Sequence, residues 1–260
     1  MSYFNRNAHY WVNKADQAKL AKQHTQTMER IHADDIAASV AGSIIYGPKM
    51  PDSDGKTGRP DFVYEDLDTV SSVMKHAMDR HLCVLNFASY KNPGGGFLAG
   101  SSAQEESLCH TSDLYNVLSR MPDYYEYNNA HKNRALYTDR ALWTPQIIFE
   151  KDDRMAIADV VTCAAPNFPT AEKYGHATYE ENLAVLRMRT VFLKRVLEAQ
   201  GVHTAILGAW GCGVFGQHPD DVAKLFCEIF SDSTIQTIVF AVPSGGHGKA
   251  NAEAFQAVCR

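Results

Sequence analysis

The sequence has no long hydrophobic run, no excess of positive charge and no paired cysteine motif. No stretch approaches the roughly 18 apolar residues that a membrane helix requires, and no charged-then-apolar leader opens the sequence. The formal net charge is −5 over 260 residues, which argues against a protein that binds nucleic acid mainly by neutralising phosphates. We therefore expect no membrane association and no basic nucleic-acid-binding surface.

Cysteine and histidine are present, but neither forms a metal-binding or disulfide pattern. The eleven histidines show no spacing of the H-E-x-x-H type. The cysteines form no C-x-x-C pair and lie mostly in apolar runs, which is typical of free thiols in a reducing compartment; they are Cys83, Cys109, Cys163, Cys212, Cys227 and Cys259. We expect a cytoplasmic protein that needs no metal or other cofactor.

The order of hydrophobic patterns predicts an α/β fold. Buried-strand patterns alternate with amphipathic helices, and this alternation favours a mostly parallel sheet covered by helices on both faces. The expected strands are 61–64, 82–88, 146–149, 155–163, 204–207 and 235–242, and the expected helices are 66–80, 104–118, 178–200, 219–230 and one that begins near residue 251.

The first 60 residues have a different character. Residues 13–31 have helical periodicity but are polar almost all round, as in a surface helix, and residues 51–60 are rich in loop-forming residues. We predict an N-terminal helical extension and loop, residues 1–60, packed on a main domain that comprises residues 61–260.

Two glycine-rich segments follow two of the expected strands. In an open α/β sheet, ligands bind at the carboxyl ends of strands, and glycine lets successive N–H groups converge on an anion. Glycines also form ordinary turns, but two such segments on neighbouring strand ends favour a ligand cradle. The segments are Asn92-Pro93-Gly94-Gly95-Gly96 and Gly208-Ala209-Trp210-Gly211-Cys212-Gly213-Val214-Phe215-Gly216.

The second segment also matches the dinucleotide fingerprint G-x-G-x-x-G, with Asp232 near the distance of a ribose-binding acid. That fingerprint requires a helix to begin within the glycines, whereas Pro219 marks the first helical turn after the last of them. Only 44 residues follow Gly216, too few to complete a doubly wound nucleotide domain. The sequence therefore disfavours a dehydrogenase.

Two adjacent glutamates follow the first glycine segment. Residues 102–105, S-A-Q-E, fit a capping box in which Ser102 caps a helix and Glu105 returns to the Ser102 N–H. The box does not explain Glu106. Because adjacent helical residues point about 100° apart, we expect one carboxylate to hold a ligand and the other to transfer a proton, as glycosidic cleavage requires. The helix N-terminus favours the ionised acid, and a dry pocket favours the protonated acid, so the sequence leaves the protonation state open.

A wider pattern surrounds these glutamates. Residues 86–108 read N-F-A-S-Y-K-N-P-G-G-G-F-L-A-G-S-S-A-Q-E-E-S-L, with seven residues between G-G-G and Q-E-E. Together with L-Y-T-D (136–139), A-A-P-N (164–167) and G-A-W-G-C-G-V-F-G (208–216), the pattern resembles the poly(ADP-ribose) glycohydrolases, in particular their microbial-type branch. The likeness extends over most of the chain from about residue 61.

The resemblance implies a macrodomain-like, three-layer α/β/α fold with a mixed, mostly parallel sheet that binds ADP-ribose. It implies hydrolysis of ribose–ribose O-glycosidic bonds in poly(ADP-ribose), mainly from chain ends, with release of ADP-ribose. Glu106 would protonate the glycosidic oxygen and then activate water, Glu105 would hold the ribose hydroxyls, and Phe215 would pack on the terminal ribose. The implied substrate contacts are Asn92, Gly94, Gly95, Gly96, Gln104, Gly211, Cys212, Gly213, Val214, Phe215 and Gly216.

The sequence leaves the reaction and some of the ligand contacts open. The same pocket would suit a mono-ADP-ribosyl hydrolase that acts on protein or nucleic-acid adducts, and the same fold serves as a non-catalytic ADP-ribose reader. The intact Q-E-E favours an enzyme whose partners are poly(ADP-ribose) or ADP-ribosylated macromolecules. Asn86 and Ser89 are further polar candidates, and Tyr64 and Glu65 are candidates for the adenine contact.

Overall fold

The computed structural model describes residues 13–49, 57–245 and 248–259, so part of the predicted loop 51–60 lies outside the described residues. The strands form one seven-stranded sheet in the order β1-β4-β5-β3-β6-β7-β2. They are β1 (Ile44–Tyr46), β2 (Asp61–Glu65), β3 (Leu82–Phe87), β4 (Ala141–Lys151), β5 (Arg154–Cys163), β6 (Thr204–Leu207) and β7 (Thr237–Ala241). Strand β4 pairs antiparallel with β1 and β5, and every other pairing is parallel. The predicted mixed, mostly parallel sheet is confirmed.

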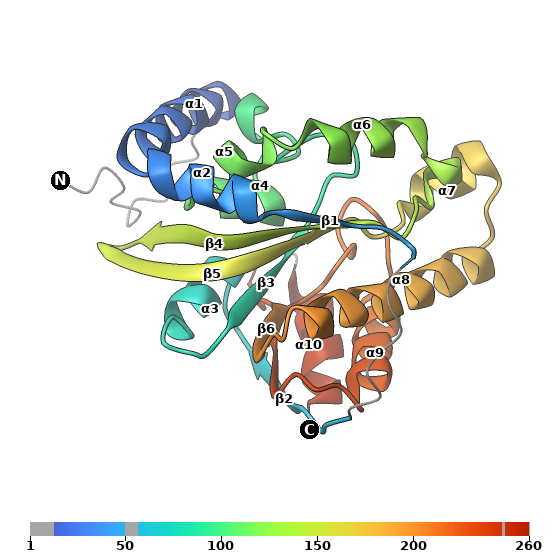
Figure 1. Cartoon of the computed structure of the whole chain (residues 1–260). Helices are drawn as coiled ribbons and strands as arrows, with labels where there is room; N and C mark the ends of the chain where they lie inside the picture. The colour runs from blue at the N-terminus through green and yellow to red at the C-terminus, as the bar shows by residue number, and fades with distance from the viewer. Residues whose placement is uncertain (1–12, 50–56, 246–247, 260) are drawn as a thin grey trace.

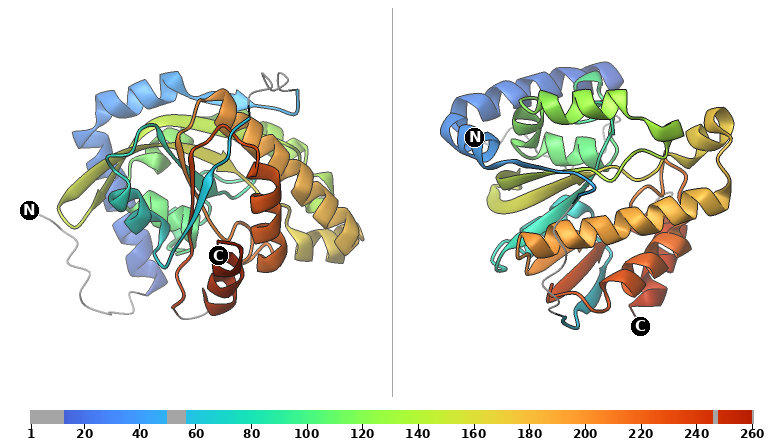
Figure 2. Two further views of the ribbon diagram at one scale, coloured as in Figure 1. Left: turned by 90° about the horizontal axis from the view of Figure 1, so that it is seen from below. Right: turned by 45° about the vertical axis from the view of Figure 1, so that its right-hand side comes forward.

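Helices cover both faces of this sheet (Figure 1). One layer contains α1 (Lys14–Ile31), α2 (Ala33–Gly42), α3 (Thr69–Lys75), α4 (Gln104–His110), α5 (Leu114–Leu118) and α6 (Pro122–Ala130). The other contains α8 (Tyr179–Ala199), α9 (Pro219–Phe230) and α10 (Lys249–Val258), with α7 (Phe168–Gly175) preceding α8. Two views from other directions show the same three layers (Figure 2). The architecture is α/β/α, as predicted.

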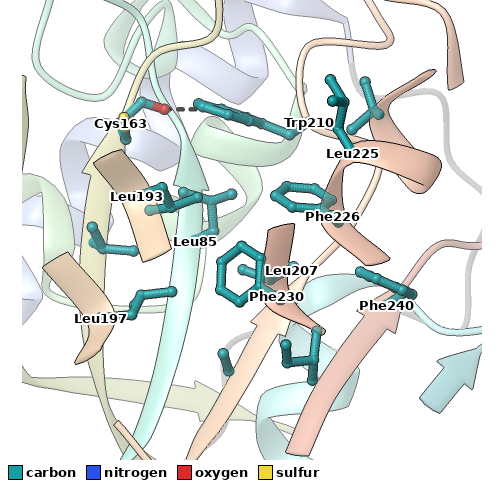
Figure 3. Packing of buried hydrophobic residues seen from close by; sticks show 14 of the residues in the cluster. Leu85, Cys163, Leu193, Leu197, Leu207, Trp210, Leu225, Phe226, Phe230 and Phe240 are labelled. Atoms are coloured by element: carbon teal, nitrogen blue, oxygen red, sulfur yellow. Dashed lines mark hydrogen bonds between the residues drawn. The ribbon is translucent and has the colours of Figure 1, made fainter. Parts of the chain in front are cut away.

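Strand alternation divides the core between the two faces. In β3, Leu82 and Val84 pack toward the α3–α4 layer, whereas Cys83 and Leu85 pack toward the α8–α9 layer, because successive side chains of a strand point to opposite faces. Trp210 packs in the part of the core that faces α8 and α9. Its indole Nε1 donates a hydrogen bond to Cys163 O at 3.0 Å (Figure 3). The second glycine loop is thereby anchored in the core by one of its own side chains.

The N-terminal helix packs on the loop that leads to α4. A Cβ on Gly100 would overlap Lys14 O and lie 3.0 Å from Ala18 N, so α1 rests directly against the end of the 3₁₀ turn η1 (Phe97–Ala99). His24 Nε2 lies 2.9 Å from Ser112 O. The predicted helix 13–31 is confirmed, and the boundary at residue 60 stays a prediction.

Several predicted elements differ from the observed ones; the predicted helix 66–80, for example, is shorter and runs from Thr69 to Lys75. The predicted helix 104–118 breaks into α4 and α5 because the hydroxyls of Thr111 and Ser112 bond to the Ser107 and Leu108 carbonyls, which gives the backbone an alternative to a continued helix. The predicted strand 146–149 is a part of β4, which starts at Ala141 and carries a bulge between Thr144 and Ile147. The bulge interrupts the period-2 pattern from which strands are recognised.

Candidate active site

The two glycine segments lie side by side at the carboxyl edge of the sheet. Strands β3 and β6 are parallel neighbours, so the segments that follow Phe87 and Leu207 emerge next to each other. Between them is a cavity of about 850 Å³. Its lining includes Gly95 and Gly96 from the first segment and Gly211, Gly213, Val214 and Phe215 from the second. Both glycine segments therefore border one cavity.

The first segment is shaped around the glutamates. Gly94 and Gly95 have φ values of 66° and 60°, a region that glycine adopts without steric cost. A Cβ on Gly95 would lie 2.6 Å from Glu106 Oε1 and 2.9 Å from Glu105 Oε2. Both carboxylates thus converge on one backbone position that has room only for a glycine.

Glu105 is the more deeply buried carboxylate, with 3% of its surface exposed. Its Oε2 accepts a hydrogen bond from Ser89 N at 2.6 Å, and its Oε1 accepts one from Asn86 Nδ2 at 3.2 Å. Burial raises the pKa of Glu105 to about 8, opposed by the bonds from Ser89 and Asn86 and reinforced by the charge of Glu106. For Glu105, the dry pocket outweighs the helix N-terminus, and the carboxyl carries its proton at neutral pH.

Glu106 has a simpler environment. It is 6% exposed and lines the cavity. The N–H of Gly96 donates to its Oε1 at 2.8 Å, and no other hydrogen bond to this carboxylate is found within the described residues. One oxygen is therefore held by the loop while the other is left for a ligand.

The predicted capping box is wrong. Helix α4 has Ala103 as its N-cap, with no side-chain cap bond, and Glu105 turns to Ser89 and Asn86 rather than back to Ser102. The start of the helix is held by Gln104, whose Oε1 accepts from Phe87 N and whose Nε2 donates to Leu85 O, both at 2.9 Å. This amide continues the hydrogen bonding of β3 onto α4 and so sets where both glutamates point.

The second segment presents unpaired backbone donors. Within the described part of the chain, the N–H groups of Gly213, Val214 and Phe215 make no hydrogen bond to protein. Three successive N–H groups beside a cavity form a site for an anion such as a diphosphate. Gly216 is needed for a different reason, because its φ is 65° and a Cβ there would lie 2.6 Å from Pro169 Cγ.

The dinucleotide fingerprint does not have its usual geometry here. Helix α9 begins at Pro219, with His218 as its N-cap, beyond Gly216 rather than within the glycines. Asp232 forms an ion pair with Lys194 on the surface of α8. The prediction against a dehydrogenase is consistent with both observations.

Most of the predicted contact residues border the cavity. Those that line it are Ser89, Asn92, Gly95, Gly96, Gln104, Glu105, Glu106, Gly211, Gly213, Val214 and Phe215. Gly94 and Gly216 supply turns, Cys212 points its Sγ toward Trp210 O at 3.8 Å, and Asn86 supports Glu105 from below; none of these four is in the lining. Gln104 lines the cavity, but its amide is bonded to β3.

The two candidates for the adenine contact lie outside the cavity lining. Neither Tyr64 nor Glu65 lines the cavity. Glu65 is buried and accepts hydrogen bonds from Ser72 Oγ at 2.8 Å and Lys75 Nζ at 2.6 Å, and Tyr64 OH donates to Val242 O at 3.2 Å. The lining at this end comes instead from residues that follow β7 and begin α10: Val242, Pro243, Gly248 and Asn251. Only the strand-end rule for β7 could have indicated them.

A buried arginine that the sequence analysis missed connects two of the family motifs. Arg189 is 1% exposed; its Nε donates to Asp139 Oδ1 and its Nη1 to Ala164 O, both at 2.6 Å. It therefore ties L-Y-T-D to A-A-P-N. Tyr137, in the first motif, lies with its ring centroid 6.1 Å from that of Phe215. An arginine on the apolar face of α8 was the available signal.

The described residues offer no metal site and no membrane segment. No group of three or more His, Cys, Asp or Glu side chains among them is placed to hold a metal ion. None of the helices in the described ranges is long and apolar enough to span a bilayer.

A sheet between two layers of helices, with two glycine-rich loops and two buried glutamates at its strand ends, defines a macrodomain-like hydrolase. Residues 9–152 match the family model described as microbial-type PARG, catalytic domain. The chain belongs to the microbial-type poly(ADP-ribose) glycohydrolases.

Solved structures agree with this assignment. The poly(ADP-ribose) glycohydrolase of Thermomonospora curvata, solved also with the inhibitor ADP-HPD, is 28% identical with a TM-score of 0.82, over 94% of this chain and 99% of that one. The enzyme of Deinococcus radiodurans in complex with ADP-ribose is 30% identical with a TM-score of 0.75, over 86% of this chain and 96% of that one. No match was found among curated proteins.

Proposed function

We propose that this glycohydrolase cleaves the ribose–ribose O-glycosidic bonds of poly(ADP-ribose), mainly from chain ends, and releases ADP-ribose. The observation that carries the proposal is the convergence of Glu105 and Glu106 on Gly95 at one wall of the cavity. A reader of ADP-ribose has no need of two buried carboxylates at this place, because their burial costs free energy that ligand binding alone does not require.

The anionic part of the ligand is assigned to the second glycine loop. The free N–H groups of Gly213, Val214 and Phe215 would bind the diphosphate, so that backbone dipoles rather than lysines neutralise it. Phe215 would pack on the terminal ribose, with Tyr137 behind its ring. This places the terminal ribose between the loop and the two glutamates.

Glu106 is assigned the proton transfers. Glu106 gives a proton to the glycosidic oxygen as the bond to the ribose C1″ carbon breaks, and its carboxylate then takes a proton from the water that attacks this carbon. The Gly96 N–H holds one of its oxygens in place throughout.

Glu105 is assigned a positioning role on the ribose hydroxyls. A carboxyl with a pKa of about 8 is protonated at neutral pH, so it both donates to and accepts from hydroxyl groups. Asn86 and the Ser89 N–H fix its orientation from the protein side. We propose that Gln104, which joins α4 to β3, sets the relative placement of the two glutamates.

The test measures release of ADP-ribose from poly(ADP-ribose) and, separately, from mono-ADP-ribosylated protein. Glu106→Gln should lower kcat roughly 10²- to 10⁴-fold and leave ADP-ribose binding within a few-fold of the native value. Glu126→Gln makes the same chemical change on an exposed face of α6 and should change neither. Full activity in Glu106→Gln would refute the mechanism, and activity on the mono-ADP-ribosylated substrate alone would identify a mono-ADP-ribosyl hydrolase instead.

A further inference from the structure

A second cavity, of about 870 Å³, lies between α1 and the hairpin that joins β4 to β5. These two elements lie on the same side of the molecule (Figure 1), and His32 Nε2, just after α1, is 3.3 Å from Glu150 Oε1 of β4. Asp152 and Asp153, with φ values of 50° and 58°, form the two-residue turn of the hairpin, as in a type I′ turn. The second cavity is as large as the first, and none of the assigned functions uses it.

The two cavities are adjacent. Thr111 and Lys151 line both of them. One face of α4 lines the first cavity. It carries Gln104, Ser107 and the C-cap residue Thr111. Helix α4 has seven residues, so this face is roughly 10 Å long at 1.5 Å per residue. One end of the helix carries the catalytic glutamates, and the other end opens into the second cavity.

The lining of the second cavity includes two arginines together with the carboxylates of Glu150, Asp152 and Asp153. Arg30 of α1 and Arg154 of β5 both line it and are exposed. Within the described residues neither takes part in a salt bridge, although the Nη2 of Arg154 donates to Met74 O at 2.8 Å. Guanidinium groups bind phosphate oxygens with two parallel hydrogen bonds. The guanidinium of Arg30 and the nitrogens of Arg154 that are not bonded to Met74 O can therefore bind a diphosphate.

Apolar surface accompanies these arginines. Ile31 is 56% exposed and Met155 is 60% exposed, and both line the second cavity. Apolar side chains and methionine in particular pack favourably on aromatic rings, and an adenine base presents such a ring. The acidic side chains of Asp152 and Asp153, also in the lining, can accept hydrogen bonds from ribose hydroxyls.

We propose that the second cavity binds the ADP-ribose unit next to the scissile bond, on the leaving-group side. The inference rests on the proposed function and deepens it, because a cavity for a second unit makes a chain of ADP-ribose, rather than a single adduct on a side chain, the preferred substrate class. The terminal unit occupies the cavity between the glycine loops, and the polymer continues past Glu106 along α4. Diphosphate, base and ribose of the second unit then face the guanidinium, apolar and carboxylate groups described above.

The test compares binding of free ADP-ribose with binding of an oligomer of two ADP-ribose units. Both ligands are titrated calorimetrically into the Glu106→Gln chain, in which turnover is slow. The two-unit oligomer should bind about tenfold more tightly than ADP-ribose. Adding Arg30→Ala and Arg154→Ala should remove most of that difference and leave the affinity for ADP-ribose within twofold.

The matched control is Lys19→Ala with Lys22→Ala. Both lysines are exposed on α1, neither lines the cavity, and their removal changes the net charge by the same amount. This pair should leave the preference for the two-unit oligomer intact. Equal thermal unfolding midpoints of the two double variants would show that both are folded.

The outcomes separate the two proposals. If ADP-ribose itself does not bind, the proposed function fails. If ADP-ribose binds and the two-unit oligomer binds equally well, or if the arginine pair weakens both ligands alike, the second subsite is refuted while the proposed function stands. Loss of the oligomer preference in the lysine control would reduce the effect to overall charge and also refute the subsite.

Discussion

Gly95 and Glu106 lie so close together that a Cβ on Gly95 would be 2.6 Å from Glu106 Oε1. The next residue, Gly96, donates its N–H to the same oxygen at 2.8 Å. The loop backbone therefore binds the Glu106 carboxylate and fixes its position. Packing of this side chain requires glycine at position 95, whether or not a ligand is bound.

Gly95→Ala should displace Glu106 and lower kcat roughly 100-fold, because displacements of about 1 Å at a reacting group have effects of that size. Gly201→Ala is the matched control, since Gly201 also has a left-handed φ, of 67°, but a Cβ there meets nothing within 4 Å. Both variants should lose about 1 kcal/mol of unfolding free energy through strain. Steady-state kinetics decide between them: equal activities would contradict the steric relationship.

The pH dependence of stability should reveal Glu105. Its pKa is raised from 4.5 to about 8 by burial, so between those values the folded chain binds more protons than the unfolded one. The free energy of unfolding should therefore decrease as the pH rises from 4.5 to 8. Glu105→Gln should remove this decrease and be more stable than the native chain above pH 8, by on the order of 1–4 kcal/mol, while losing activity.

Urea denaturation of the native and Glu105→Gln chains across this pH range measures the difference between their unfolding free energies. Asp113, whose pKa burial raises to about 6, contributes equally to both chains and cancels. Parallel stability profiles for the native and Glu105→Gln chains would show that Glu105 does not carry the raised pKa.

Gly100→Ala should test whether the N-terminal helix supports the catalytic loop. An added Cβ would overlap Lys14 O and push α1 away from the end of η1. We expect a loss of about 2 kcal/mol in unfolding free energy, within the range for backbone strain, together with a lower kcat. The substitution tests this role without removing α1 from the chain. Unchanged kcat despite the lost stability would limit α1 to a structural role.

Arg187 and Arg189, both on α8, should differ sharply in their contribution to stability. Arg189→Ala leaves two carbonyls and the partly exposed carboxylate of Asp139 without their donor and should cost about 3 kcal/mol, the lower end of the range for breaking a buried pair. Arg187→Ala breaks an exposed pair with Glu228, in which the side chains are 47% and 58% exposed, and should cost under about 1 kcal/mol. Urea unfolding at one pH measures both, and similar values would contradict the interior role of Arg189.

Binding of the polyanionic substrate should depend only modestly on salt. The proposed diphosphate site uses backbone N–H groups, and the proposed second subsite would add two arginines, each worth roughly −0.7 in slope on a single strand. The plot of log affinity against log salt should therefore be shallower than about −3. A steeper slope in a titration of the two-unit oligomer would point to a basic groove that the assignment lacks.

Local pattern was a good guide where hydrophobic periodicity and turn chemistry agree. Strand β6 and helix α9 have the predicted bounds, and helix α8 lies within one residue of its prediction. Pattern failed where side chains compete with the backbone. Ser102 and Glu105 have the spacing of a capping box, yet Glu105 finds better donors in Ser89 and Asn86 from β3 and its loop. Such partners are 16 or more residues away and invisible to a local rule.

The sequence by itself determined the α/β alternation, the glycine loops and the Q-E-E motif, because each depends on residue type and short spacing. Only the tertiary structure decided which glutamate is more deeply buried, that Gln104 joins α4 to β3, and that Arg189 links two distant motifs. It also placed Arg30 and Arg154 at one cavity, which shares Thr111 and Lys151 with the cavity between the glycine loops. These relationships depend on contacts between segments far apart in the chain, and only packing brings such segments together.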